Sequence, residues 1–160
     1  MRLIDFGHFL ILENMENVIA EIQVSYNTNS RVKQKITSSA SAYEILKANW
    51  DEGRLELQEE FKVLLLNRAN DVLGIYNMSM GSVSGTVVDV RLLFAVALKC
   101  NASGILISHN HPSGNLNPSE ADKEITKKIK QASDIFDIKM IDHIIITHLG
   151  YFSFLDNGIC

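Results

Sequence analysis

Two histidines and one aspartate have the residue types and the spacing of a metal site. His109 and His111 stand two positions apart, directly after the apolar run Gly104–Ser108. On an extended backbone the side chains of residues i and i+2 point to the same side, so both imidazoles can reach one point. Asp122 follows a loop rich in proline, glycine and asparagine. Two imidazoles and one carboxylate leave the fourth tetrahedral position open for water, which is the ligand count of a catalytic zinc site.

Ser119 and Asp122 also have a purely structural explanation. The pattern Ser-x-x-Asp is close to a capping box, in which Ser119 is the N-cap and Asp122 the third residue of a helix. Two histidines in a polar loop can likewise be incidental. However, His, His, Ser and Asp at four fixed offsets should arise by chance in roughly one in ten thousand chains of this length. We therefore interpret the four residues as one site.

This spacing resembles the JAMM (MPN+) metalloprotease signature, His-x-His, seven residues and Ser-x-x-Asp, with Pro112–Pro118 as the seven. The wider sequence resembles the RadC-like branch of that superfamily. The matching segments are Glu59–Phe61, Gly85–Thr86, His109–Gly114, Pro118–Asp122, Asp142–Ile145 and Tyr151–Phe154. The resemblance covers roughly residues 19–158. We therefore expect a RadC-like JAMM/MPN metallohydrolase domain at residues 19–160 and an N-terminal extension of unknown role at residues 1–18.

The resemblance implies a fold, a cofactor and a reaction. The fold is a three-layer α/β arrangement like that of JAMM proteins and cytidine deaminases, and the cofactor is one Zn²⁺ per chain bound by His109, His111 and Asp122. The reaction is hydrolysis of an amide bond in a peptide or isopeptide substrate by a metal-activated water. Ser119 would donate a hydrogen bond to the developing oxyanion.

The superfamily also uses an upstream glutamate as general base, and two neighbours compete for that role here. The usual position in RadC-like sequences, two residues before the apolar start of a strand, selects Glu59, while Glu60 remains the alternative. On a strand the two carboxylates face opposite sides, so they cannot share the role. A third alternative is that both are solvated residues at the start of the strand.

Three further histidines lie outside this motif. His143 follows Asp142 at the front of an apolar strand, where it could support the site by hydrogen bonding. A buried, hydrogen-bonded structural histidine is the more frequent case. We expect His8 and His148 to be surface residues.

Hydrophobic periodicity predicts the elements that must position these residues. Strands are expected at residues 19–26, 61–66, 72–78, 104–108, 138–147 and 151–155, and helices at residues 39–50, 90–100 and 119–136. The strands at 61–66 and 72–78 are expected to form a hairpin, and residues 81–85 a turn. The expected inward stripes are Val90, Leu93, Phe94, Ala97 and Leu98 on the second helix, and Ala121, Ile125, Ile129, Ala132 and Phe136 on the third. Strands alternating with helices predict an α/β fold, and the hairpin makes its sheet mixed.

Composition restricts the function classes. The chain has 160 residues, of which 46% are hydrophobic, and this indicates one globular domain. A net charge of −4 gives no general attraction to nucleic acid or to an acidic membrane surface. Cys100 and Cys160 form neither a zinc ribbon nor a disulfide framework. Without a signal peptide or an apolar run of about 18 residues, we expect a cytoplasmic protein with no membrane partner.

Two other function classes remain open alongside hydrolysis. The domain could be a metal-binding interaction module that performs no chemistry, although the intact ligand motif argues against this. It could instead be associated with DNA repair, as the RadC-like resemblance and the His-Asn-His string suggest. The acidic balance and the lack of the helix-hairpin-helix segment of longer RadC-like proteins oppose that role. The sequence carries no signal for the oligomeric state.

Overall fold

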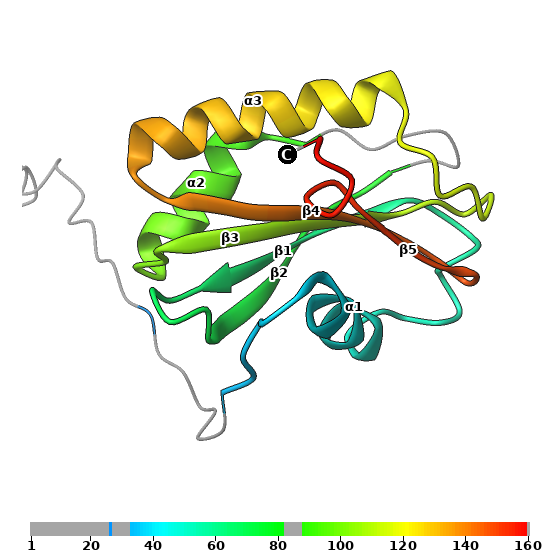
Figure 1. Ribbon diagram of the computed structural model, residues 1–160, viewed down its shortest axis with the longest axis horizontal. Coiled ribbons are helices and arrows are strands. Elements are labelled where there is room, and N and C mark those ends of the chain that lie inside the picture. The colour runs from blue at the N-terminus through cyan, green and yellow to red at the C-terminus, as the bar shows by residue number, and fades with distance from the viewer. Residues whose placement is uncertain (1–25, 27–32, 82–87, 160) are drawn as a thin grey trace, which may run out of the picture.

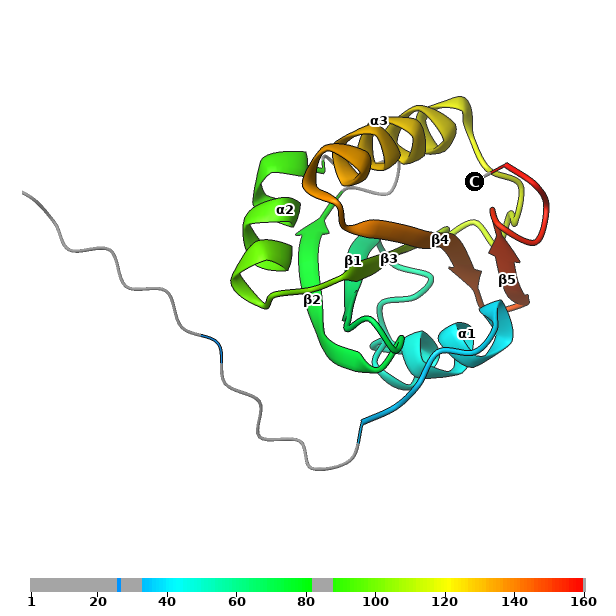
Figure 2. The same cartoon turned by 60° about the vertical axis from the view of Figure 1, so that its left-hand side comes forward.

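The computed structural model describes residues 26, 33–81 and 88–159. Its centre is a five-stranded sheet with the order β2-β1-β3-β4-β5, with α1 on one face and α2 and α3 on the other (Figures 1 and 2). The elements in chain order are α1 (Ser39–Ala48), β1 (Glu60–Leu66), β2 (Val72–Met80), α2 (Val90–Lys99), β3 (Gly104–Asn110), α3 (Glu120–Phe136), β4 (Lys139–Thr147) and β5 (Gly150–Ser153). The three-layer α/β architecture expected from the sequence is confirmed.

β3 is the central strand of the sheet, with an antiparallel neighbour on one side and a parallel neighbour on the other. It pairs antiparallel with β1 and parallel with β4, while β1 and β2 form the predicted hairpin. A parallel pair requires a crossover, and α3 supplies it between β3 and β4. The carboxyl end of β3 and the start of α3 are therefore joined at the same edge of the sheet.

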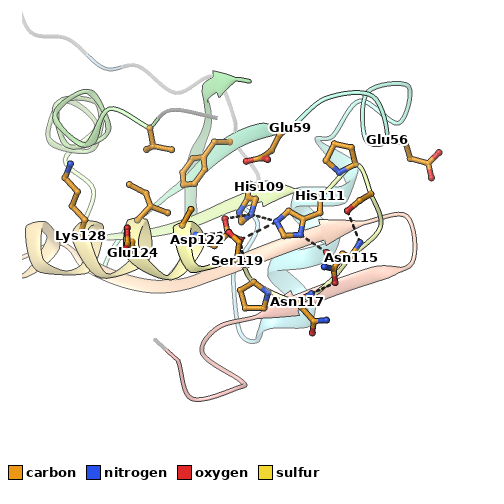
Figure 3. A pocket seen from close by; sticks show the side chains of 17 residues that line it. Glu56, Glu59, His109, His111, Asn115, Asn117, Ser119, Asp122, Glu124 and Lys128 are labelled. Atoms are coloured by element: carbon orange, nitrogen blue, oxygen red, sulfur yellow. Dashed lines mark hydrogen bonds and ion pairs between the residues drawn. The ribbon is translucent and has the colours of Figure 1, made fainter. Parts of the chain in front are cut away.

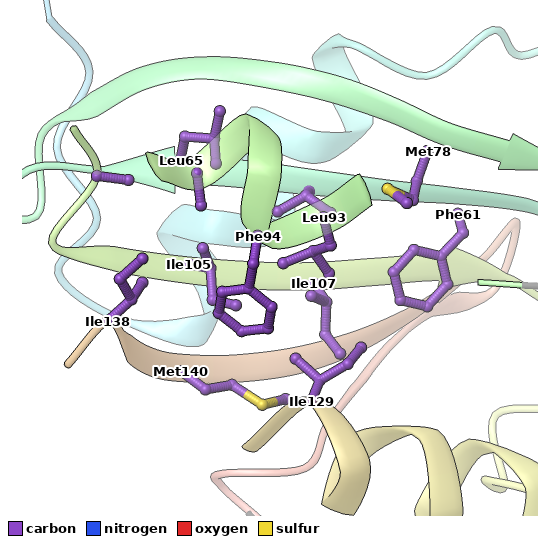
Figure 4. Packing of buried hydrophobic residues seen from close by; sticks show 13 residues of the cluster. Phe61, Leu65, Met78, Leu93, Phe94, Ile105, Ile107, Ile129, Ile138 and Met140 are labelled. Atoms are coloured by element: carbon purple, nitrogen blue, oxygen red, sulfur yellow. The ribbon is translucent and has the colours of Figure 1, made fainter. Parts of the chain in front are cut away.

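Two hydrophobic layers hold the sheet, because successive side chains of β1 and β3 point to opposite faces. The layer against α2 and α3 contains the cluster of Figure 4, with Phe61, Leu65, Leu93, Phe94, Ile105, Ile107 and Ile129 among its members. The layer against α1 contains Leu46, Trp50, Leu64, Leu66, Leu106, Ile144 and Ile146. Every residue of β1 and β3 is buried, so a polar side chain in either strand must find its partners inside the protein.

The predicted starts of the first two helices are confirmed by their caps. Ser38 caps α1 in a capping box, and the Asp89 carboxylate accepts a hydrogen bond from the N–H of Arg91 at 2.9 Å. Cys100 is the C-cap of α2, and burial raises the pKa of its thiol. In the expected inward stripe of α2, Leu93, Phe94 and Ala97 are buried, whereas Leu98 is 52% exposed.

The expected inward face of α3 is wrong in part. Ala121 and Phe136 are exposed, whereas the buried residues of α3 are Asp122, Thr126, Ile129 and Ser133. The observed inward face is therefore shifted around the helix from the expected one and includes polar side chains. The first turns of α3 lie over the end of β3 that carries His109. Hydrophobic periodicity cannot detect a face that is buried for its hydrogen bonds.

Other sequence predictions concern where elements begin and end. The strand predicted at residues 104–108 extends to Asn110, so His109 is itself a strand residue. The predicted strand 19–26 lies outside the described residues except for Tyr26, as do the extension at residues 1–18 and residues 82–87 of the turn region. Within the described part of the chain, no helix has the length and apolar character needed to cross a bilayer.

Candidate metal centre

The carboxyl end of β3 brings the two histidine rings together. His109 is 1% exposed and shares the face of Ile105 and Ile107. His111 follows the strand, yet its N–H donates to the carbonyl of Ile146 at 3.0 Å and continues the pairing with β4. The extended geometry therefore reaches one residue past β3. As a result, the Nε2 atoms of His109 and His111 lie 2.9 Å apart.

A tight turn sends the chain from His111 back toward α3. The Gly114 N–H donates to the His111 carbonyl at 3.0 Å, and Gly114 has a φ of +78°, which favours glycine. A Cβ at Gly114 would lie 2.9 Å from Cε1 of His148, so a larger residue would also displace that ring. His148 is half-exposed, as expected, but its Nδ1 also lies 2.8 Å from the Glu56 carboxylate. His8 lies outside the described residues.

Asp122 reaches the histidines from the first turn of α3. Ser119 and Asp122 form the capping box that the sequence allowed, and Asp122 Oδ2 accepts from the Ser119 N–H at 2.6 Å and from its hydroxyl at 2.7 Å. The same carboxylate places Oδ1 3.2 Å from His109 Nε2 and Oδ2 3.5 Å from His111 Nε2. Capping and metal binding are therefore compatible, because the capping bonds fix the carboxylate beside the two rings.

The three side chains offer the kinds of donor atoms that zinc prefers, at suitable distances from one another. Within the described residues they form a group that could hold a metal ion, with ligand atoms all within 4.8 Å of one another. In a tetrahedral site with bonds of 2.0–2.1 Å, neighbouring ligand atoms are about 3.3 Å apart. The shortest distances between the three side chains are 2.9 Å between the two rings, 3.2 Å from His109 to Asp122 Oδ1 and 3.5 Å from His111 to Asp122 Oδ2, all close to that value. Donor types and spacing agree with a site of two nitrogens and one oxygen (Figure 3).

A buried chain of hydrogen bonds determines which nitrogen of His109 faces the site. The Thr126 hydroxyl donates to the Asp122 carbonyl, so it must accept from His143 Nδ1–H at 2.7 Å. His143 Nε2 then carries no proton and accepts from His109 Nδ1–H at 2.8 Å. The lone pair of His109 is therefore on Nε2, the atom that faces His111. The expectation that His143 is buried and hydrogen-bonded is confirmed, and Phe154 stacks on its ring at 4.5 Å.

A backbone carbonyl gives His111 the same tautomer. His111 Nδ1 lies 2.6 Å from the carbonyl oxygen of Asn115, which can only accept. Nδ1 therefore carries a proton, and Nε2 is the atom available to a metal. Each ring is thus oriented by a partner on its far side, as is usual for metal-binding histidines.

The charges of the cluster favour a cation. The Asp122 carboxylate, which can accept a hydrogen bond from the protonated ring, raises the pKa of His111 above its ordinary value, against the effect of burial. Burial opposes ionisation of Asp122, but the two imidazoles beside it, His109 and His111, hold the pKa of its carboxyl well below the usual range. Burial holds the pKa of His143 well below its ordinary value. Near neutral pH the carboxylate is ionised and His143 is neutral, so the proton on His111 is the one that a metal cation would have to displace.

The ligand cluster opens into a cavity of about 830 Å³ between the 112–118 loop, β1 and α3. Glu59 lines this cavity, and Figure 3 shows its carboxylate above His109 and His111. Ala121 and Ile125 of α3 also line it. This explains why their apolar side chains are not fully buried in the core: they form a wall of the cavity.

Glu60 lies on the other side of β1, where it is buried. Its carboxylate is 3.2 Å from Lys62 Nζ and 3.7 Å from Arg54 Nη1. Lys62 in turn lies 4.6 Å from the Trp50 ring centroid, under α1. The structure therefore separates the two glutamates as strand alternation predicts, with Glu59 beside the histidines and Glu60 in an ion pair.

Sequence reasoning missed three residues that the site depends on. Thr126 could have been found, because it stands four residues after Asp122 and so shares its helix face. Asn115 acts through its backbone carbonyl, which no side-chain pattern reveals. Asn110 lies between the two histidines, and its partners are too distant in sequence for a local pattern to reveal them.

The first prediction concerns the pH dependence of metal affinity. Because the raised pKa of His111 keeps a proton on the metal-free site, binding must release it, and the affinity should rise with pH until that pKa is passed. Asp122 is already ionised and contributes nothing to this rise. Zinc titrations against a chromophoric chelator between about pH 5 and about pH 8 should show up to about tenfold tighter binding per pH unit.

Two alanine variants check the ligand assignment in the same titration. Wild type should bind one zinc per chain, and both His109→Ala and His111→Ala should lose that binding. His148→Ala is the control and should retain it. Full zinc occupancy in either ligand variant would show that the metal lies elsewhere.

A second prediction separates the capping role of Asp122 from its role as a ligand. Asp122→Asn keeps an oxygen that can accept both bonds from Ser119 but removes the negative charge. Zinc affinity should therefore fall far more than the thermal stability of the metal-free protein. Asp89→Asn, at the start of α2, is the matched control and should leave zinc affinity intact. If the metal-free Asp122→Asn protein were destabilised but bound zinc with normal affinity, Asp122 would be a helix cap and not a metal ligand.

A third prediction tests the chain from Thr126 to His109. Thr126→Val preserves shape but removes the acceptor for His143 Nδ1–H, so His143 is no longer held in one tautomer. We expect zinc affinity to fall about 10- to 100-fold, and ¹⁵N imidazole spectra of the metal-free protein to show a mixture of His143 tautomers. Thr147→Val, at another buried threonine, is the control. Unchanged affinity and a single tautomer in Thr126→Val would contradict the assignment.

Comparison with known proteins agrees with the fold and the motif. The family model described as RadC-like JAB domain matches residues 36–159, which contain every helix and strand described above. A UPF0758 protein of Flavobacterium johnsoniae is 52% identical over 126 residues, 79% of this chain and 54% of the relative. A UPF0758 protein of Thermotoga maritima is 34% identical over 129 residues, 80% of this chain and 56% of the relative. The chain thus spans about half the length of these curated relatives. It belongs to the RadC-like JAB domain family.

Proposed function

We propose that this domain is a zinc-dependent hydrolase of amide bonds, acting on a peptide or an isopeptide. His109, His111 and Asp122 hold the metal, and Glu59 serves as the general base. The observation that carries the proposal is the ligand geometry: two imidazole nitrogens 2.9 Å apart, each within 3.5 Å of a different oxygen of one carboxylate, at the edge of a cavity that Glu59 also lines. A structural zinc site would have four protein ligands and no opening.

The bound metal would supply Lewis acidity and a water of lowered pKa. Glu59 accepts a proton from the attacking water, whose oxygen adds to the carbonyl carbon of the substrate. When the C–N bond breaks, Glu59 returns the proton to the nitrogen of the leaving amine. The base must face the ligand cluster for both transfers, and Glu59 meets that requirement while the buried ion pair of Glu60 does not.

Ser119 can contribute only after a change of hydrogen-bond partner. Its hydroxyl donates to Asp122 Oδ2, so stabilising an oxyanion requires that proton to turn toward the substrate. The Ser119 backbone N–H remains bound to Asp122 at 2.6 Å and keeps the ligand in place during the exchange. The proposed role is therefore compatible with the cap.

The shape of the cavity favours a chain-like substrate. It extends from the histidines along one face of α3, past Ala121 and Ile125 to Glu124 and Lys128 (Figure 3). Apolar contacts near the metal and charged groups at the far end can bind several consecutive groups of an extended chain. The JAMM metalloproteases that the motif resembles hydrolyse peptide and isopeptide bonds, which agrees with this shape.

The fourth prediction identifies the base. Glu59→Gln should keep zinc and fold, because Glu59 is not a ligand and the amide has nearly the same shape. The hydrolysis rate should fall by about 10² to 10⁴, the usual contribution of a positioned general base. Glu60→Gln is the matched neighbour: it weakens a buried ion pair and should lower stability more than rate. The measurement is chelator-sensitive cleavage of peptide and isopeptide panels, together with zinc content and thermal unfolding.

Two outcomes would contradict the proposal. Normal cleavage by Glu59→Gln with slow cleavage by a folded Glu60→Gln would move the base by one residue. A zinc-loaded wild type that cleaves nothing in the panels would favour the metal-binding interaction module over the hydrolase.

A further inference from the structure

The asparagine between the two histidines contacts the segment that carries Glu59. Asn110 is completely buried, and its side chain points to the α1 face because strand neighbours alternate. There its Nδ2 donates to the carbonyls of Leu55 at 2.7 Å and Gln58 at 2.9 Å, and its Oδ1 accepts from the Glu60 N–H at 2.7 Å. One side chain therefore binds the residues immediately before and after Glu59.

No other side chain of this size matches those partners. The segment presents two acceptors and one donor, and an asparagine amide offers two donors and one acceptor in the same plane. A carboxylate would face two carbonyl oxygens, and an apolar side chain would leave three buried backbone groups without partners. A further bond, from the Gly81 N–H to the Glu59 carbonyl at 2.8 Å, holds the backbone of Glu59 from the β2 side.

We propose that Asn110 is a positioning residue, which fixes Glu59 relative to the metal ligands through the backbone of residues 58–60. This inference rests on the proposed function for the role of Glu59, but the contacts themselves do not. His109, Asn110 and His111 are consecutive, so the ligands point to one face of the sheet while the residue between them anchors the base from the other. The distance between base and ligands is then set by one short stretch of backbone.

Hydrogen exchange tests the anchor without any assay of activity. In the zinc-loaded wild type, the Glu60 amide should be as protected as the amides inside β1. Asn110→Ala should raise exchange across residues 55–60 and leave one zinc per chain. Asn67→Ala is the matched control, because Asn67 organises the turn at the other end of β1 through three similar bonds. That control should affect its own turn and leave residues 55–60 unchanged.

A double-mutant cycle tests the positioning role. If Asn110 acts through Glu59, Asn110→Ala should lower kcat about 10- to 100-fold with little change in KM, and should cost almost nothing more in a Glu59→Gln background. Asn110→Ser, which keeps one hydroxyl able to donate or accept, is measured in the same way if the alanine variant does not fold, and it should show a smaller loss of the same kind. A fast-exchanging Glu60 amide in wild type would refute the anchor, and additive losses in the cycle would refute the positioning role. A zinc-loaded wild type without hydrolysis would instead refute the proposed function and leave the exchange result standing.

Discussion

The Nε2 atoms of His109 and His111 lie 2.9 Å apart beside a carboxylate, and the surrounding elements must hold them at that distance. Two lone pairs at that distance repel each other unless a proton or a cation lies between them. The protein holds them with rigid partners: paired strands behind His109 and His111, a capped helix behind Asp122, and a hydrogen-bond acceptor behind each ring. Because the ligand atoms are fixed in advance, metal binding requires little rearrangement.

The two faces of β3 divide the work of the site. On one face, His109 continues the row of Ile105 and Ile107. The His109 side chain therefore lies beside the hydrophobic cluster that packs against α2 and α3. On the other face, Ser108 donates to the Ile144 carbonyl at 2.7 Å and Asn110 binds the segment before β1. Alternation along one strand thus joins the candidate metal ligands, the core and the proposed anchor of Glu59 within a few residues.

The sequence predicted the parts of the site that depend on local geometry. The i, i+2 spacing of the histidines, the capping box at Ser119 and the opposite directions of Glu59 and Glu60 follow from the repeat of a strand or a helix. The predicted end of the strand at residue 108 is too early. Turn-forming residues follow that position in the sequence, but parallel pairing with β4 extends the strand to Asn110. Pairing between strands distant in sequence is not visible in a local pattern.

The parts that could not be predicted depend on tertiary contacts. Thr126 and His143 meet only because α3 crosses over β4, and Asn110 meets Leu55 only because β1 pairs with β3. The inward face of α3 was misjudged for the same reason, since Asp122 and Thr126 are buried by their partners and not by hydrophobicity.

X-ray absorption at the zinc edge of the zinc-loaded protein reports the number, type and distance of the atoms around the metal. We expect a four-coordinate shell of two imidazole nitrogens and two oxygens at about 2.0 to 2.1 Å, one oxygen from Asp122 and one from water. The second oxygen should be replaceable by an added inhibitor that binds zinc. A shell containing sulfur at about 2.3 Å, or four protein ligands with no exchangeable position, would contradict the account.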